Sequence, residues 1–323
     1  MAIKYGVTQI GAELGSRVLL NTMFLVCALF LLPSAASAQD ISVACSAALA
    51  KDMPARLPAA MGGRAFVERV RDISGAERDD ATRAELLSGN LPRFLTRLKP
   101  VTLRGQMANG EIVAITLCVA PDYLSVGSDN DFVRVPMGLA AAVTVADRFG
   151  FVLPTPRMVD AIYRQAEAQL APQPMPAGSQ MRSTDYFWRH NQIIGAQRQA
   201  LRAPLDALTA GDKKDLVMTN RLWANPERVA IYGWQKKDGK PIQPLSTVHG
   251  ARYADYSHGV RLVSNVAYVN GLARSIYDIL KDPNLAPVLS SEGAIRINDL
   301  EATVASRTVA PVVALADDAP SHL

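Results

Sequence analysis

Histidine and cysteine are scarce in this sequence: its 323 residues include only 4 His and 3 Cys, so imidazole and thiol chemistry are confined to a few positions. Net charge is also small, at +4, which argues against a nucleic-acid-binding protein. Only one apolar run approaches membrane length. With 49% hydrophobic and 20% charged residues, the composition excludes disorder, collagen and coiled coil as the dominant state.

The apolar run occupies residues 18–32, between Arg17 and the small-residue stretch AASA at 35–38. This three-part layout is typical of a secretory signal peptide that is cleaved after Ala38. The run is shorter than the roughly 20 residues of a membrane-spanning helix. We therefore predict a signal peptide at 1–38 and a secreted or periplasmic mature protein with no membrane span.

Removal of the signal peptide takes away Cys27 and leaves Cys45 and Cys118. Compartments outside the cytoplasm favour disulfides, and two cysteines allow one pairing, so we predict a Cys45–Cys118 disulfide. The alternative is a nucleophilic Cys118. Its position in the apolar run IVAITLCVA indicates a buried strand, whereas a reactive thiol needs an electropositive, partly exposed site.

The mature chain shows no internal repeat and no long low-complexity tract. Residues 41–98 have helical spacing of apolar positions, and β-branched runs in 101–126 flank Asn109-Gly110, a strong hairpin signal. We expect a helical region with a β-hairpin and a helix pair at 39–170, an α+β region at 171–306 and a flexible tail at 307–323. The predicted fold is α+β, a mostly antiparallel sheet surrounded by helices, with one disulfide.

Local patterns place further elements. We expect helices at 137–150, 153–166, 186–203 and 265–280, and strands at 215–222, 228–234 and 260–263. The second helix has the clearest start, with Thr155 as N-cap and Pro156 in the first helical position. Turns are expected at 127–131, 211–212 and 237–239 because Gly, Asp and Asn cluster there.

The segment 243–263, QPLSTVHGARYADYSHGVRLV, is the one stretch that suggests chemistry. It contains His249, Arg252, Tyr253, Asp255, Ser257, His258 and Arg261, with a glycine after each histidine. Expected strands on both sides would hold it as a loop on a rigid sheet, a common placement for active residues. The alternative is a surface turn that carries two of the four histidines by chance.

Three mechanisms fit these groups. In the first, His249 or His258 is a general base oriented by Asp255, and Ser257 is a nucleophile or an anchor that pairs best with His249. In the second, His249, Asp255 and His258 bind zinc, with His190 as an additional ligand.

In the third mechanism no bond is broken. Arg252 and Arg261 bind a carboxylate or phosphate, because the arginine fork suits such anions. Tyr253 lies beside them in sequence, and Lys214 and Arg221 would add positive charge at the rim of the same site. The alternative for Lys214 and Arg221 is a solvated turn.

Part of this segment resembles a known family. His249-Gly250, Ser257-His258-Gly259 and Arg261-Leu262 resemble the active-site strand and loop of the YkuD-type L,D-transpeptidases, which cross-link bacterial murein. That family has a cysteine directly after SHG, where this sequence has Val260, so the resemblance does not imply thiol chemistry.

Two other resemblances are broader. Ser246, His249, Ala254 and Asp255 resemble the first half of the zinc motif of D-Ala-D-Ala-type peptidases. The whole chain resembles a secreted bacterial family with a YADYSHG core. The peptidase and transpeptidase resemblances both imply murein as a substrate.

We therefore expect a secreted or periplasmic hydrolase or transferase that acts on a cell-envelope polymer, murein or another glycan, through a His/Asp site. The alternative is a non-catalytic envelope- or glycan-binding protein that uses the same loop. The expected partners are an envelope polymer or a small anionic ligand, without nucleic acid. Zinc is the one cofactor that the residues suggest.

Overall fold

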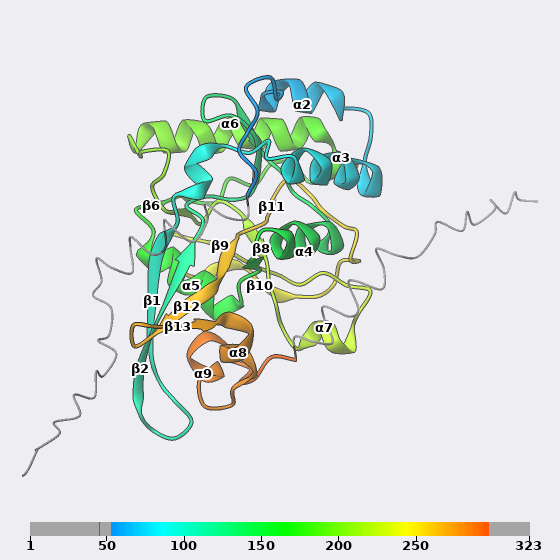
Figure 1. Ribbon diagram of the computed structural model, residues 1–323. Coiled ribbons are helices and arrows are strands. Elements are labelled where there is room, and N and C mark those ends of the chain that lie inside the picture. The colour runs from blue at the N-terminus through cyan, green and yellow to red at the C-terminus, as the bar shows by residue number, and fades with distance from the viewer. Residues whose placement is uncertain (1–44, 46–52, 297–323) are drawn as a thin grey trace, which may run out of the picture. The chain divides into compact units, whose positions relative to one another are not determined.

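A computed structural model describes Cys45 and residues 53–296 of the chain (Figure 1). One contact-dense unit contains all of these residues. The predicted signal peptide at 1–38 and the predicted tail at 307–323 lie outside the described residues.

The predicted α+β class is confirmed, with 33% helix and 23% strand. The helices are α2 (Gly63–Arg69), α3 (Gly75–Leu87), α4 (Leu139–Arg148), α5 (Pro156–Gln165), α6 (Thr184–Ala200), α7 (Arg221–Ala224), α8 (Ile276–Lys281) and α9 (Ala286–Leu289), with 3-10 turns η2 (Arg93–Thr96) and η3 (Ser179–Arg182). In Figure 1, α2, α3 and α6 lie together at the top. Toward the bottom, α8 packs against the strands β12 and β13, and α9 packs against α8 and β1.

The largest sheet is antiparallel throughout, with the strand order β1-β2-β12-β13 and β5 added to β12. Its strands are β1 (Lys99–Gln106), β2 (Ile112–Val119), β5 (Phe151–Val152), β12 (Val263–Val269) and β13 (Leu272–Ser275). The sheet thus combines strands from both of the regions expected on either side of residue 170.

A second sheet has the order β10-β9-β8-β11, and two further pairs are β3·β4 and β6·β7. The pairs β8·β11 and β6·β7 are parallel and the others are antiparallel, so the sheets are mostly antiparallel, as predicted. These strands are β3 (Ser125–Gly127), β4 (Phe132–Arg134), β6 (Ala168–Gln169), β7 (Thr209–Ala210), β8 (Lys214–Leu216), β9 (Ile231–Gln235), β10 (Pro241–Ser246) and β11 (His258–Gly259).

The hairpin predicted at Asn109-Gly110 joins β1 to β2. The Met107 N–H donates to the Glu111 carbonyl (2.8 Å), which closes the loop. Gly110 has φ +91°, a left-handed conformation that a glycine adopts without the steric cost of a Cβ. The dipeptide therefore sets the register of the longest strand pair.

The start of α5 follows the sequence signal closely. Thr155 is the N-cap, its hydroxyl accepts a hydrogen bond from the Met158 N–H (3.2 Å), and Pro156 is the first helical residue. Met158 and Ile162 are buried on the side that faces the core. The helices predicted at 137–150 and 186–203 are also present, as α4 and α6.

The helix predicted at 265–280 is wrong over most of its length. Residues 263–275 form the hairpin β12–β13, and only Ile276–Lys281 is helical, as α8. Asn270 (φ +48°) and Gly271 (φ +86°) occupy the two turn positions, and positive φ at both is what a tight hairpin turn requires. The Asn-Gly dipeptide thus ends the strand where the apolar spacing suggested a continuous helix.

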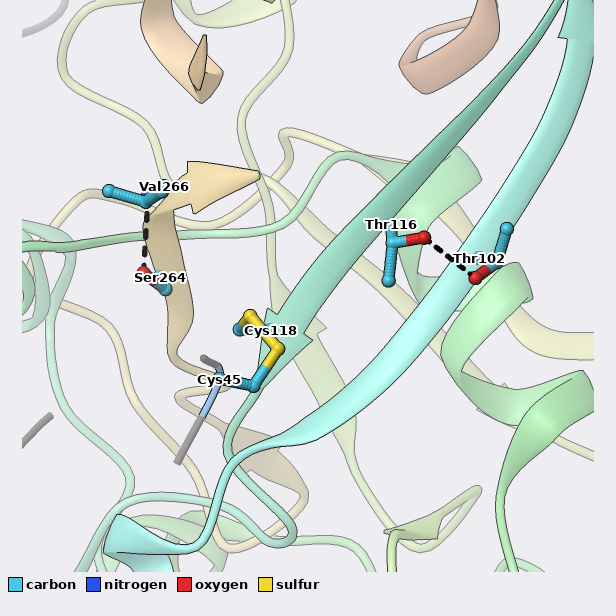
Figure 2. The surroundings of a disulfide bond; sticks show 6 residues. All are labelled: Cys45, Thr102, Thr116, Cys118, Ser264 and Val266. Carbon is cyan, nitrogen blue, oxygen red and sulfur yellow. Dashed lines mark hydrogen bonds between the residues drawn. A yellow bond between two sulfur atoms is a disulfide. The ribbon is translucent and has the colours of Figure 1, made fainter. Parts of the chain in front are cut away.

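The predicted Cys45–Cys118 disulfide is present, with the two Cα atoms 5.2 Å apart (Figure 2). Cys118 belongs to β2, and both cysteines are buried. The bond joins the segment before α2 to the central sheet. On the same strand, the Thr116 hydroxyl hydrogen-bonds to Thr102 of β1 (2.9 Å), also visible in Figure 2.

A membrane span is absent from the part of the chain that the structure describes, since no helix there is both long and apolar enough to cross a bilayer.

A charged group lies at the centre of the molecule. Asp122, directly beyond β2, is fully buried and accepts hydrogen bonds from Arg134 of β4 (2.6 and 2.9 Å) and from Arg198 of α6 (3.2 Å). Both guanidiniums are buried as well. The two arginines hold the pKa of Asp122 below its usual value, although burial alone would raise it. One carboxylate thus connects the main sheet, the β3–β4 hairpin and α6.

Reduction of the disulfide is expected to lower the free energy of unfolding by about 4 kcal/mol, because a bond between cysteines 73 positions apart restricts the unfolded chain. Urea denaturation with and without dithiothreitol measures this difference. A Cys45→Ser/Cys118→Ser variant is the control and should not respond to the reductant. An equal response in both proteins would contradict the expectation.

Replacing Asp122 by Asn is expected to cost about 3–5 kcal/mol, because it removes the charged partner that two buried guanidiniums share. The matched control is Glu68→Gln, which removes one partner of the exposed Glu68–Arg71 pair and should cost less than about 1 kcal/mol. Chemical denaturation of both variants measures the difference. A similar decrease in the free energy of unfolding for both variants would show that Asp122 stabilises the fold no more than an exposed carboxylate does.

Candidate functional site

The candidate segment connects two strands of the four-stranded sheet. β10 ends at Ser246 and β11 begins at His258. Two backbone hydrogen bonds fix the path between them: the Val229 N–H donates to the His249 carbonyl (3.0 Å), and the Leu139 N–H donates to the Ala251 carbonyl (2.8 Å). Because Leu139 begins α4, the start of that helix holds the segment in place.

Four side chains of the segment meet in a group that we call the His249 cluster: His249, Tyr253, Asp255 and His258. The rings of His249 and Tyr253 stack with their centroids 4.0 Å apart and their planes within 8°. The Tyr253 hydroxyl donates to Asp255 Oδ2 (3.1 Å), and His258 Nε2 lies 3.9 Å from the same oxygen. The two histidine rings are 6.1 Å apart.

Exposure divides the cluster into two layers. His249 and Tyr253 are partly exposed, whereas Asp255 is 1% exposed and His258 is fully buried. Only the outer pair is therefore accessible from solvent. Asp255 lies behind it, bonded to the Tyr253 hydroxyl, and His258 lies beside Asp255.

Ser257 is an anchor. Both its backbone N–H (2.8 Å) and its hydroxyl (2.6 Å) donate to Asp255 Oδ1, and the side chain is fully buried. The nearest acid–base partner of Ser257 is thus Asp255, whereas the sequence suggested His249. Of the two roles considered for Ser257, the geometry favours the anchor over the nucleophile.

The histidines of the cluster are neutral at neutral pH. Burial lowers the pKa of His258 from 6.5 to about 4, despite the opposing effect of Asp255, and burial also lowers the pKa of His249. Burial and the nearby Asp255 charge raise the pKa of Tyr253 to about 12. For Asp255, burial opposes ionisation, but His258, Ser257 and Lys214 together bring its pKa below the usual value.

Lys214 of β8 lies next to this cluster. It lies opposite His258 in the parallel pairing of β8 with β11. Its ammonium nitrogen is 5.1 Å from the centre of the Trp234 ring. The parallel pairing of β8 with β11 thus brings Lys214 next to a histidine 44 positions away in sequence.

Three other predicted residues have different surroundings. Arg261 is fully buried and donates to the carbonyls of Ala120 (3.0 Å) and Thr209 (2.6 Å), so its guanidinium binds the protein's own backbone instead of the expected substrate. Arg221 begins α7 and donates to the Leu245 carbonyl (3.0 Å). Arg252, next to Tyr253, is exposed.

His190 lies on α6, fully buried, with its ring 4.9 Å from that of Tyr256. Burial lowers its pKa to about 2, so it stays neutral. Among the described residues, no group of three or more His, Cys, Asp or Glu side chains is arranged to hold a metal ion. The geometry thus lends no support to the zinc site suggested for His190, His249 and His258.

Gly259 lies close to another part of the protein, the side chain of Tyr123, at a distance that only a residue without a Cβ allows. A Cβ on Gly259 would lie 2.5 Å from the ring of Tyr123. The Tyr123 hydroxyl in turn donates to Asp215 (3.0 Å) on β8. The backbone of the SHG motif therefore rests on a buried aromatic ring.

Sequence reasoning missed Asp79 and Arg182. Asp79 of α3 accepts a hydrogen bond from the Gly138 N–H (3.0 Å) at the start of α4, and burial raises its pKa to about 6. The Arg182 guanidinium lies 5.4 Å from the centre of the Tyr253 ring. Both are distant from the segment in sequence, so only the fold reveals their positions.

Comparisons with protein-family models, curated proteins and solved structures found no match. The site is therefore interpreted from its own geometry.

Protonation of His258 is expected to destabilise the folded protein. The pKa of His258 is 6.5 in the unfolded chain and about 4 in the folded protein. Between these values the unfolded state binds the proton more tightly, so the free energy of unfolding decreases as the pH falls. His258→Gln removes that contribution. The stability difference between wild type and variant should shrink by about 1.4 kcal/mol per pH unit between pH 6.5 and pH 4.

Urea denaturation at several pH values measures the difference. The wild-type curve alone is not diagnostic, because Asp79 and Asp215, with pKa values raised by burial to about 6 and about 7, change stability in the opposite direction. A difference that is constant with pH would show that His258 keeps an ordinary pKa.

Proposed function

We propose that this protein is a secreted or periplasmic hydrolase or transferase that acts on a cell-envelope polymer, murein or another glycan. The compartment is inferred from the signal-peptide pattern at 1–38 and is compatible with the disulfide. The substrate class is inferred from the resemblance of the His249–Leu262 region to murein enzymes. The catalytic role is inferred from the His249 cluster.

The observation that carries the proposal is the stack of His249 on Tyr253. A partly exposed imidazole is held parallel to an aromatic ring, whose hydroxyl is fixed by a buried carboxylate. This series of contacts positions the His249 ring by stacking, without a hydrogen bond from any described residue to either of its nitrogens. Burial keeps its pKa below 6.5, so His249 is unprotonated and able to accept a proton at neutral pH.

The proposed reaction uses His249 as the general base. His249 takes a proton from a water molecule, or from an acceptor hydroxyl in the transferase case, and the oxygen attacks the electrophilic carbon of the polymer. The imidazolium then returns the proton to the leaving group. Asp255 and His258 are positioning residues: Asp255 holds the Tyr253 hydroxyl, and the buried His258 ring lies 6.1 Å from that of His249.

A non-catalytic binding protein is the second candidate. The observation that favours it is the burial of Ser257 with its hydroxyl bound to Asp255, which leaves the cluster without an exposed side-chain nucleophile. In this case the exposed Arg252 and the half-buried Lys214 hold an anionic envelope component, and His249 contributes a ring contact.

Digestion of purified murein sacculi by the mature protein tests the proposal, with released fragments identified by mass spectrometry. His249→Gln should lower kcat/KM at least about 100-fold, the usual weight of a general base. The wild-type rate should fall in acid with a midpoint below pH 6.5, because protonated His249 cannot accept a proton. Val248→Ala is the control, since the Val248 side chain is exposed beside His249.

Equal rates for wild type and His249→Gln would overturn the site assignment. Binding of sacculi by the wild type without release of fragments would identify the protein as the binding alternative. Loss of activity after chelation, with recovery on adding zinc, would show that a metal acts in the reaction.

A further inference from the structure

Two cations beside the His249 cluster are held by aromatic rings instead of by carboxylates. The Arg182 guanidinium lies 5.4 Å from the Tyr253 ring centre, and the Lys214 ammonium 5.1 Å from that of Trp234. Within the described part of the chain, no carboxylate comes within salt-bridge distance of either cation. An aromatic face positions a cation but does not neutralise its charge.

Fully buried cations elsewhere in the protein have hydrogen-bond acceptors of their own. Arg134 and Arg198 pair with Asp122, whereas Arg261 and Lys213 donate to backbone carbonyls. Lys214 is half-buried, and burial lowers its pKa although the nearby Asp255 opposes this shift. A partly desolvated ammonium without a direct salt bridge is costly to maintain, and an anionic ligand would add to the partial compensation from Asp255.

The backbone beneath Lys214 is strained. Trp234 has φ +57°, a left-handed conformation that costs of order 1–3 kcal/mol for a bulky residue, and follows Gly233 with φ +112°. The Trp234 ring lies against Lys214, and the buried indole N–H has no hydrogen-bond partner among the described residues. Strained aromatic residues with unused donors are typical of binding sites.

Both cations flank the Tyr253–Asp255 pair. Arg182 faces the ring of Tyr253, and Lys214 pairs in register with His258, the other neighbour of Asp255. The acids near them are already engaged: Asp255 accepts from Tyr253 and Ser257, and Asp79 accepts from the Gly138 N–H. Neither of these carboxylates forms a salt bridge with Arg182 or Lys214, so both cations remain available to an external anion.

We propose that Arg182 and Lys214 form an oxyanion subsite beside His249, where a carboxylate or phosphate of the substrate binds while His249 acts on a neighbouring bond. This inference rests on the proposed function for the reacting bond, but the binding of the anion does not depend on turnover. Trp234 and Tyr253 position the two cations, and the subsite makes Arg182 and Lys214 specificity residues.

Binding of inorganic phosphate and of N-acetylmuramic acid, a sugar carboxylate, tests the subsite by calorimetry and tryptophan fluorescence. Arg182→Gln and Lys214→Gln should each weaken binding about tenfold, and Lys214→Arg should keep most of it. Arg189→Gln is the control, since Arg189 is an exposed arginine of α6, the helix that follows Arg182 in the chain. Thermal unfolding of each variant establishes that it is folded.

The two probes separate the sources of the anion. Variant-sensitive binding of N-acetylmuramic acid alone assigns a carboxylate, and that of phosphate alone assigns a phosphate. Unchanged binding in both Arg182→Gln and Lys214→Gln, or an equal loss in Arg189→Gln, would overturn the subsite.

Failure of the subsite and failure of the proposed reaction give different results. If His249→Gln binds the probes normally and the wild type releases no fragments from sacculi, the reaction fails and the subsite stands. If the wild type cleaves murein fragments with amidated carboxylates as fast as the free acids, and binds neither probe, the subsite fails and the reaction stands.

Discussion

The fold depends on one buried carboxylate, that of Asp122, because several elements are joined through it. An isolated charge cannot remain in a protein interior, so the chain must deliver counter-charges to it. Arg134 comes from the β3–β4 hairpin and Arg198 from α6. Displacing either element would take one of the two arginines away from the buried Asp122 carboxylate. The next residue, Tyr123, extends the connection to Asp215 of β8, and thus to the second sheet.

The segment between β10 and β11 is fixed at two points. Gly259 packs on the Tyr123 ring, and the Ala251 carbonyl accepts a hydrogen bond from Leu139 at the start of α4. The arrangement explains why His249 can be partly exposed and still well positioned. Its ring depends on Tyr253, Tyr253 depends on Asp255, and Asp255 is fixed by Ser257 within a buried turn. Each contact restricts the rotamers of the next side chain outward, and only His249 and Tyr253 are accessible from solvent.

Local signals in the sequence were sufficient where a few adjacent residues decide the structure. Thr155 and Pro156 start a helix through their own side chains, Asn109-Gly110 closes a hairpin, and a single cysteine pair has a single partner. The sequence also concentrated attention on His249, Asp255 and His258, which the fold brings together.

Features that depend on residues far apart in the sequence could not be predicted from it. The apolar spacing of 265–280 suits a helix or strands, and the turn at Asn270-Gly271 decides between them only with β2 alongside. Arg261 looks like a ligand-binding arginine in sequence, yet its carbonyl partners lie on segments some 50 and 140 positions away. Asp79 and Arg182 carry no local mark because their neighbours are contributed by the fold.

The contact of Gly259 with Tyr123 changes how the SHG motif should be used in comparisons between proteins. β11 contains only two residues, so a long ladder of hydrogen bonds cannot define its position, and the aromatic ring beneath Gly259 does so instead. A side chain at this position is excluded by packing whether or not the protein is an enzyme. Retention of this glycine in a relative would therefore be evidence of a shared interior, and shared chemistry would have to be judged from His249 and the residues around it.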